Sequence, residues 1–255
     1  MALLTTETKA SVLPPLPREH GAWFILAGSV LVGPALTGRF GAGHVALLLG
    51  AYGALIGRSA LRGKRTLDRV WAAFLLGFAV VINVAIFVSA PSPMLLGAGA
   101  AAVLLGGTQI VLDRRRQQRL LAAEVVGIGL LTALAPASLA LCGFDAGPRA
   151  LSVVAANALY FLVTVPYVRA RVFGPKAPEV WRALRFDPLI LAALGALVMA
   201  LAIGPLAAAA FAVQLARAAR LAWSPPGPPR SVARLGWTEV GSTVFYVVVL
   251  WLVSL

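Results

Sequence analysis

Residues 70–90 read VWAAFLLGFAVVINVAIFVSA, a run without a single charged side chain. A helix needs roughly 20 mostly apolar residues to cross the ~30 Å hydrocarbon core of a bilayer, so this run predicts a membrane-spanning helix. The chain as a whole is also strongly apolar, since 60% of its 255 residues are hydrophobic and only 12% are charged. Soluble domains carry about 25% charged residues, because their surface must be wetted. The sequence therefore predicts a protein whose outer surface faces lipid.

Eight further apolar runs bring the predicted number of spans to nine. The nine lie at 21–38, 43–57, 70–90, 94–112, 120–143, 150–168, 188–204, 205–221 and 238–255. The second is short and needs Arg58 to extend its side chain toward the membrane surface. The seventh and eighth form one long stretch, which we divide at Gly204-Pro205 because proline ends a helix. We expect an all-α polytopic membrane protein, with a polar tail at 1–16 and one helical domain at 17–255.

Glycines are frequent within the predicted spans. Examples are Gly97, Gly99, Gly106, Gly107, Gly127 and Gly129. Small residues let membrane helices approach one another closely, so we expect these glycines to lie at helix–helix contacts.

Basic residues are concentrated in alternate connections. Of the 22 Lys+Arg residues, all but Arg39 and Arg149 lie in the N-terminal tail or after the second, fourth, sixth and eighth spans. Basic residues accumulate on the cytoplasmic side of membrane proteins. We therefore expect a cell (plasma or inner) membrane protein with a cytoplasmic N-terminus. The net charge of +13 then reflects topology, and its dispersal among loops argues against nucleic-acid binding.

Few residues could hold a metal. Cys142 is the only cysteine, and His20 and His44 are the only histidines. These counts exclude an intrachain disulfide and a Cys/His metal cluster, so we expect no metal site and assign no cofactor.

Two carboxylates lie at the cytoplasmic ends of predicted spans. Glu124 is near the start of the fifth span and Glu239 is at the start of the ninth. An ionisable group at membrane depth costs at least ~2.5 kcal/mol and usually faces an interior cavity. We assign both as candidate catalytic acid–base groups, and the alternative is a structural ion pair for each. The candidate partners are Arg116 or Arg119 for Glu124, and Arg220 or Arg234 for Glu239.

Other polar side chains recur at helical spacing, which places each set on one helix face. The sets are Asn157, Tyr160, Thr164, Tyr167 and Arg171 in the sixth span, Glu239, Ser242, Thr243 and Tyr246 in the ninth, and Gln214, Arg217 and Arg220 in the eighth. We assign Asn157, Tyr160, Tyr167, Arg171 and Arg217 to substrate binding, with interhelical hydrogen bonding as the alternative. Pro166 removes a backbone hydrogen bond within the sixth span and predicts a local helix break.

The segment PREHGAW, residues 17–23, opens the first span. Free N–H groups and the helix dipole favour an anion at a helix start. The imidazole of His20 can move a proton near neutral pH, because its reference pKa is about 6.5. We assign Arg18 and Glu19 to substrate binding and His20 to catalysis. The alternative is a membrane anchor, with Arg18 on lipid head groups and Trp23 in the aromatic belt.

This PREHGAW start resembles the YwiC-like family of bacterial membrane proteins, which share an R/K-x-HGAW start. The resemblance extends to the span pattern and to the basic segments at 114–121 and 167–171. It implies a multi-pass membrane protein. It implies no catalytic residue, since no reaction is established for the family.

The predicted topology is also distantly similar to the UbiA superfamily of intramembrane prenyltransferases, so the fold is expected to resemble a UbiA-like bundle. Those enzymes hold Mg²⁺ against a prenyl diphosphate with two aspartate-rich motifs, near the second and sixth spans. The corresponding segments here hold only Asp68, and then Glu179 and Asp187. Because Mg²⁺ needs several converging oxygen ligands, magnesium-dependent transfer is not expected.

Three functions fit these patterns. The first is binding or modification of a membrane lipid, an isoprenoid or an anionic phosphorylated one, in a polar pocket of the cytoplasmic leaflet where the assigned residues meet. The second is a non-catalytic assembly or regulatory protein whose polar stripes are packing contacts. The third is a carrier of a small solute or proton, against which stands the absence of an internal sequence repeat.

Overall fold

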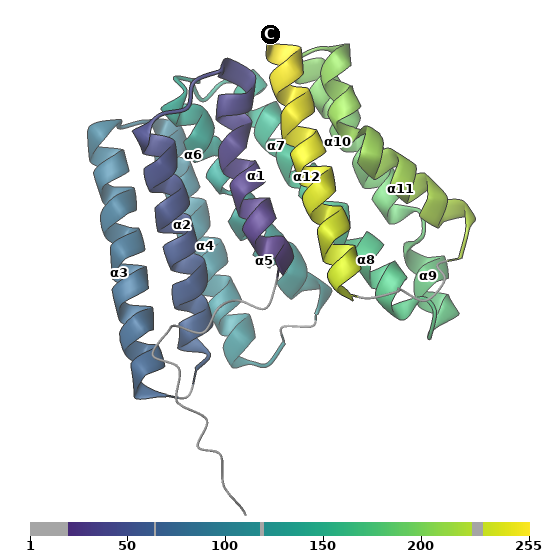
Figure 1. Cartoon of the computed structure of the whole chain (residues 1–255), viewed down its shortest axis with the longest axis horizontal. Helices are drawn as coiled ribbons and strands as arrows, with labels where there is room; N and C mark the ends of the chain where they lie inside the picture. The colour runs from purple at the N-terminus through teal and green to yellow at the C-terminus, as the bar shows by residue number, and fades with distance from the viewer. Residues whose placement is uncertain (1–19, 64, 118–119, 226–231) are drawn as a thin grey trace, which may run out of the picture.

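The computed structural model describes residues 20–63, 65–117, 120–225 and 232–255, and all regular structure within them is helical (Figure 1). The helices are α1 (His20–Thr37), α2 (Ala42–Leu61), α3 (Thr66–Ser89), α4 (Pro93–Arg114), α5 (Leu121–Thr132), α6 (Leu134–Leu141), α7 (Pro148–Leu162), α8 (Thr164–Phe173), α9 (Pro178–Leu184), α10 (Asp187–Ala202), the 3₁₀ helix η1 (Pro205–Phe211), α11 (Ala212–Trp223) and α12 (Val232–Ser254).

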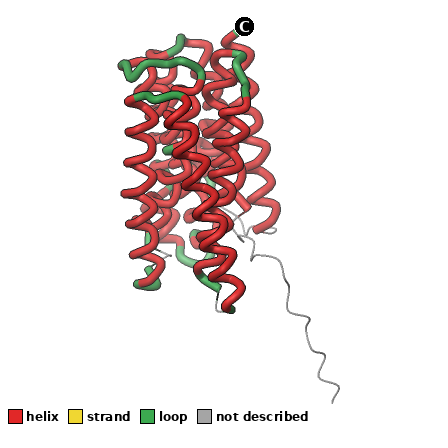
Figure 2. The backbone as a smooth tube through the Cα atoms, turned by 90° about the vertical axis from the view of Figure 1, so that its left-hand side faces the viewer, coloured by secondary structure: helices red, strands yellow, loops and turns green. Residues whose placement is uncertain are grey.

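The long helices run side by side, up and down the bundle (Figures 1 and 2). The C-terminal ends of α2, α4 and α11, together with α9, therefore lie at one end of the bundle, and the C-terminus of the chain lies at the other (Figure 1). The described basic residues gather at the first end, which we call the basic end, as in Arg62, Arg65, Arg115, Arg182 and Arg220. Arg39 and Arg149 lie at the opposite end. The segregation read from the sequence is therefore present in three dimensions.

Seven helical segments of the described chain are long and apolar enough to cross a membrane. They are Ala42–Leu61, Thr66–Ser89, Pro93–Arg114, Leu121–Leu141, Pro148–Phe173, Pro178–Ala202 and Leu235–Ser254. Of the remaining predicted spans, the first corresponds to the shorter apolar helix Gly21–Thr37 and the eighth to η1 and α11. The chain is thus an all-helical multi-pass membrane protein, whereas the number nine and the cytoplasmic side stay predictions.

Proline and glycine divide the helices where the sequence indicates. α10 ends at Ala202 and η1 begins at Pro205, with Gly204 between them at φ +138°, a backbone conformation that favours glycine. The predicted break near Pro166 is confirmed, because α7 ends at Leu162 and α8 begins at Thr164. A second break, between α5 and α6, lies at the same spacing before Pro136, since each proline leaves a carbonyl one turn earlier without its donor.

The bundle has two regions with different interiors. The packed region comprises α7, α10, η1, α11 and α12, and its core contains the buried rings of Tyr160, Phe161, Phe211 and Tyr246. The ring centroids of Tyr160 and Tyr246 are 4.0 Å apart, and Phe211 meets Tyr160 edge-on at 5.3 Å. The cavity region comprises α1 to α6 and α8, and encloses a large hollow.

Candidate functional site: a side-open cavity with a charged end

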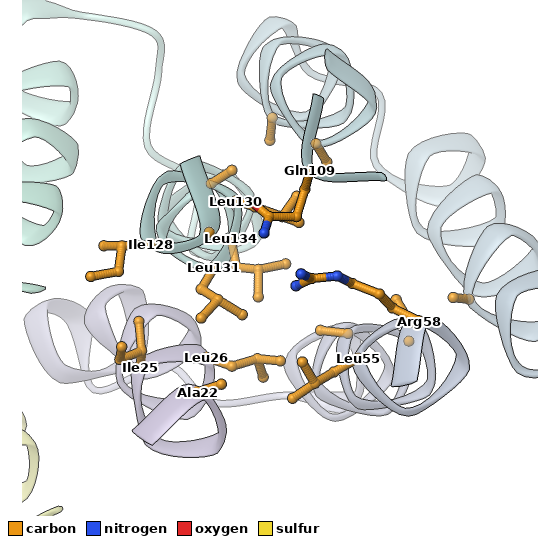
Figure 3. Close-up of a pocket in the computed structure, with 18 of the residues that line it drawn as sticks. Ala22, Ile25, Leu26, Leu55, Arg58, Gln109, Ile128, Leu130, Leu131 and Leu134 are labelled. Atoms are coloured by element: carbon orange, nitrogen blue, oxygen red, sulfur yellow. The ribbon is translucent and has the colours of Figure 1, made fainter. Parts of the chain in front are cut away.

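A cavity of about 1150 Å³ lies among α1, α2, α3, α4, α5, α6 and α8. Small-molecule sites occupy roughly 300–1,000 Å³, so this hollow exceeds the usual range. Most of its wall is aliphatic, including Leu26, Leu55, Leu131 and Leu134, which surround the space in Figure 3. Such a wall suits a hydrocarbon chain, which needs apolar contact and no hydrogen bonds.

The cavity opens sideways between α3 and α4. α3 packs on α2, whereas α4 packs on α5 and α6. Val80 and Val84 of α3 and Leu96 and Val103 of α4 line the cavity, yet each is more than half exposed. Residues that face both the hollow and the outside mark an opening. In a membrane this opening faces the lipid.

The span glycines have two kinds of surroundings. A Cβ atom at Gly106 or Gly129 would contact a leucine of the neighbouring helix, at 3.9 and 3.4 Å, which agrees with the expected helix–helix contacts. A Cβ atom added at Gly97, Gly99 or Gly107 of α4 would meet no other atom within 4 Å. Gly99 and Gly127 line the cavity. Gly97, Gly99 and Gly107 therefore border open space, which corrects the expectation for these three, whereas a Cβ atom at Gly127 would lie 3.7 Å from Gln109 Oε1 of α4.

Arg58 of α2 and Arg62, which directly follows that helix, enclose the basic end of the cavity. Arg58 and Arg62 line it, one helical turn apart, and both bind Asp113 of α4. The Nη2 atoms of Arg58 and Arg62 lie 3.0 and 2.9 Å from Asp113 Oδ2. Asp113 is 12% exposed and Arg58 is 18% exposed, so their contact is largely shielded from water, whereas Arg62 is 36% exposed. The expectation that Arg58 extends outward from a short second span is wrong: α2 continues to Leu61, and Arg58 reaches into the bundle (Figure 3).

An ion pair between α5 and α8 forms another part of the charged end. Glu124 and Arg169 both line the cavity, and Arg169 donates Nε to Glu124 Oε2 at 2.7 Å and Nη2 to Oε1 at 3.2 Å. Such bidentate pairing fixes both side chains. Glu124 is 37% exposed, so the pair is partly solvated. The partner is not Arg116, as considered from the sequence, and Arg119 lies outside the described residues.

A polar cluster of a different kind lies in the packed region. Glu239 of α12 forms an ion pair with Arg217 of α11, and both side chains are about 85% buried, being 14% and 15% exposed. Arg217 also donates Nη1 to Ser242 Oγ at 3.3 Å and lies 4.3 Å above the Tyr167 ring. Tyr160 donates its hydroxyl to the carbonyl of Ser242. The partner of Glu239 is thus Arg217, not Arg220, and the side chain of Arg234 is not described.

The two faces of α8 separate these groups. Thr164, Val168 and Arg169 face the cavity, whereas Tyr167 contacts Arg217 on the other side. Arg171 has a buried Nε without a hydrogen-bond partner in the described chain. Asn157 is fully buried on α7, where its Nδ2 lies 3.3 Å from Ser29 Oγ and its Oδ1 has no partner within that chain.

The family model described as YwiC-like protein matches residues 16–139. The N-terminal half of the chain is YwiC-like. The match includes the PREHGAW segment and every described residue that lines the cavity, apart from those of α8. No curated protein and no solved structure matches the chain. The likeness to the UbiA superfamily stays a prediction.

Only some of the assigned residues therefore share a site. Glu124, in the YwiC-like half, lines the cavity. The others with described side chains do not: Asn157, Tyr160, Tyr167, Arg171, Arg217 and Glu239. Arg18 and Glu19 lie outside the described residues, as does the side chain of His20, although α1 begins at His20. The proposed catalytic and binding roles stay predictions, but the single shared pocket is not found among the described residues.

Sequence reasoning missed five residues of the cavity's charged end: Arg58, Arg62, Gln109, Asp113 and Arg169. One signal was present in the YwiC-like half: Arg58 and Arg62 are four residues apart, as are Gln109 and Asp113, so each pair shares a helix face. Gln109 is 5% exposed and lines the cavity. No group of three His, Cys, Asp or Glu residues suited to a metal occurs in the described chain.

His44 lies at the opposite end of the YwiC-like half and is buried, at 3% exposed. Its Nδ1 accepts from the Gly41 N–H at 3.3 Å, so its Nε2 carries the proton and donates to the Ser138 carbonyl at 3.3 Å. Cys142 Sγ lies 3.4 Å from the same Nε2. An imidazole held in this tautomer cannot accept the thiol proton, so the contact joins α2 to α6 without activating Cys142.

Proposed function

We propose that this protein binds a membrane lipid with a hydrocarbon tail and an anionic head group. The observation that supports the proposal is the cavity: an aliphatic hollow, open sideways between α3 and α4, with three arginines at one end. The tail would enter through the side opening and occupy the aliphatic part. The head group would lie near Arg58, Arg62 and Arg169, since guanidinium groups bind phosphate through paired hydrogen bonds.

The charge at this end supports an anionic ligand. Arg58, Arg62 and Arg169 are held at this end by hydrogen bonds to two carboxylates, Asp113 and Glu124. Guanidinium groups gathered at the end of an otherwise apolar hollow attract an anionic group of a ligand. Isoprenoid phosphates and phosphoglycerides both combine such a head with a long tail. If the bound lipid is also modified, Glu124 is the assigned carboxylate positioned beside it.

The orientation follows from the same charges. We place the basic end in the cytoplasm, in accordance with the positive-inside rule. The charged end of the cavity then lies in the cytoplasmic leaflet of the plasma or inner membrane. A periplasmic or extracellular reporter fused after Leu255 is expected to be active, and a cytoplasmic one inactive. The reverse result would invert the topology.

Lipid binding is tested by native mass spectrometry of the purified protein, titrated with phosphatidylglycerol or phosphatidylcholine of identical acyl chains. We expect tighter binding of the anionic lipid, and loss of that preference in the double variant Arg58→Gln/Arg62→Gln. Arg182→Gln is the matched control, because Arg182 is an exposed basic residue of α9 outside the cavity. Equal binding of both lipids by the unaltered protein would contradict the proposal and favour the assembly-protein alternative.

A further inference from the structure

The side opening and the charged end of the cavity lie at different depths in the bundle. On α4, the exposed residues that line the opening extend from Leu96 to Val103, whereas Asp113 marks the charged end. Val103 and Leu96 are ten and seventeen residues from Asp113. A helix rises about 1.5 Å per residue, so the opening begins about 15 Å from Asp113 along α4 and ends about 26 Å from it.

Helix α3 places the opening at the same depth. Val80 and Val84 are 14 and 18 residues beyond Thr66, where α3 begins near the basic end. That spacing corresponds to about 21 and 27 Å along the helix. One leaflet accounts for about half of the ~30 Å hydrocarbon core of a bilayer. The opening therefore extends from the middle of the bilayer into the leaflet farther from the charged end.

The cavity wall is closed on both sides of this opening. Between the opening and the charged end, the lining residues of α3 and α4 are Leu76, Ala79 and Gln109, and none of them is exposed. Beyond the opening, a buried cluster ends the hollow. The members of this cluster that line the cavity are Leu47, Ile86, Leu95, Ala98 and Ala137. A tail that starts at the charged end and is too long for the hollow can therefore leave only through the opening.

We infer that the side opening is an outlet for a lipid tail longer than one leaflet is deep. The inference rests on the proposed function and narrows it to a class of lipid. The head group lies at Arg58, the first part of the tail fills the aliphatic hollow, and the rest passes between α3 and α4 into the bilayer. The acyl chains of a phosphoglyceride match one leaflet and need no such outlet. A polyprenyl phosphate, with its longer tail, would use it.

The test compares two polyprenyl phosphates with the same head group, farnesyl phosphate with a short tail and undecaprenyl phosphate with a long one. Val103→Trp places an indole ring at the opening, where Val103 lines the cavity and is 75% exposed. In native mass spectrometry we expect this variant to bind undecaprenyl phosphate about tenfold more weakly than the unaltered protein does, the effect of losing the burial of about two methylene groups. We expect unchanged affinity for farnesyl phosphate, because its tail ends before the opening.

Val81→Trp is the matched control. Val81 of α3 lies at the depth of the opening and is 67% exposed, but it does not line the cavity. We expect this variant to bind both polyprenyl phosphates as the unaltered protein does. Gel filtration and thermal unfolding show whether each variant is folded.

Each outcome has a distinct meaning. Unchanged affinity of Val103→Trp for undecaprenyl phosphate, an equal loss for farnesyl phosphate, or the same loss in Val81→Trp overturns the outlet while leaving lipid binding intact. Undecaprenol has the same tail without the phosphate, so equally tight binding of undecaprenol by the unaltered protein contradicts the proposed function itself. Inorganic phosphate is added as a competitor at equal concentration. We expect no displacement, and displacement would mean that the charged end takes free phosphate and not a lipid.

Discussion

The cavity region and the packed region both bury polar groups, but they satisfy them in different ways. In the packed region Arg217 contacts Glu239, Ser242 and Tyr167 at once, and aromatic rings fill the space around them. In the cavity region Arg58, Arg169 and Gln109 border an empty volume. A group enclosed by protein side chains stabilises the fold, whereas a paired arginine at the cavity wall can also contact a ligand in the hollow. The difference separates residues of structural importance from candidates for function.

Among the variants that test this difference between the two regions, Arg217→Met is expected to reduce stability most. Arg217→Met leaves the carboxylate of Glu239 buried without its partner, and loss of one member of a buried pair costs about 3 kcal/mol. We expect a strong fall in the unfolding temperature in detergent. The double variant Arg217→Met/Glu239→Leu is expected to recover most of the loss. Full stability of the single variant would show that the pair does not stabilise the packed region.

The next effect tests packing directly. A Cβ atom at Gly195 of α10 would lie 2.6 Å from Phe211 Cζ and 3.2 Å from Leu159 Cβ. Gly195→Ala is therefore expected to destabilise the protein by about 2 kcal/mol, as overpacking of a filled core does. The matched control Gly99→Ala adds its methyl group to the cavity wall, where nothing lies within 4 Å. Thermal unfolding should show no loss for this control, and similar losses for both would contradict the distinction.

A larger side chain at the same cavity position should affect binding instead of folding. Gly99→Phe places a ring in the hollow, where it would compete with a lipid tail. We expect lipid affinity to fall about tenfold, equivalent to 1.4 kcal/mol, with little change in the unfolding temperature. Lipid titration by native mass spectrometry measures the first quantity. Unchanged affinity would show that the tail does not use this part of the cavity.

The smallest expected effect is that of Glu124→Gln on stability. Glu124 is 37% exposed, so solvent screens its pair with Arg169, and we expect less than about 1 kcal/mol. Glu239→Gln, in which the pair is more deeply buried, is expected to cost more. Chemical unfolding of the two variants side by side tests the order. A larger cost for Glu124→Gln would reverse our interpretation of the two carboxylates.

Sequence patterns predicted the helices better than their contacts. Residues 70–90 indicated a span and the structure has Thr66–Ser89, because an apolar run between charges defines a helix locally. The ion-pair partners could not be predicted in this way. Arg169 is 45 residues from Glu124, and Arg217 is 22 residues from Glu239, so each pair depends on how helices pack. The glycines of α4 look the same in sequence whether they border a neighbouring helix or an open space.

Helix α8 connects the cavity region with the packed region, because one of its faces contacts each. Arg169 on one side holds Glu124 at the cavity, and Tyr167, two residues away, lies against Arg217. Val163, between α7 and α8, is itself helical, with its N–H bonded to the Leu159 carbonyl and its carbonyl bonded to the Tyr167 N–H, so α7 and α8 form one continuous segment. A ligand that displaces Arg169 would therefore also displace Tyr167, because both belong to the same helix. Occupation of the cavity would in this way change the contact of Tyr167 with Arg217 in the packed region.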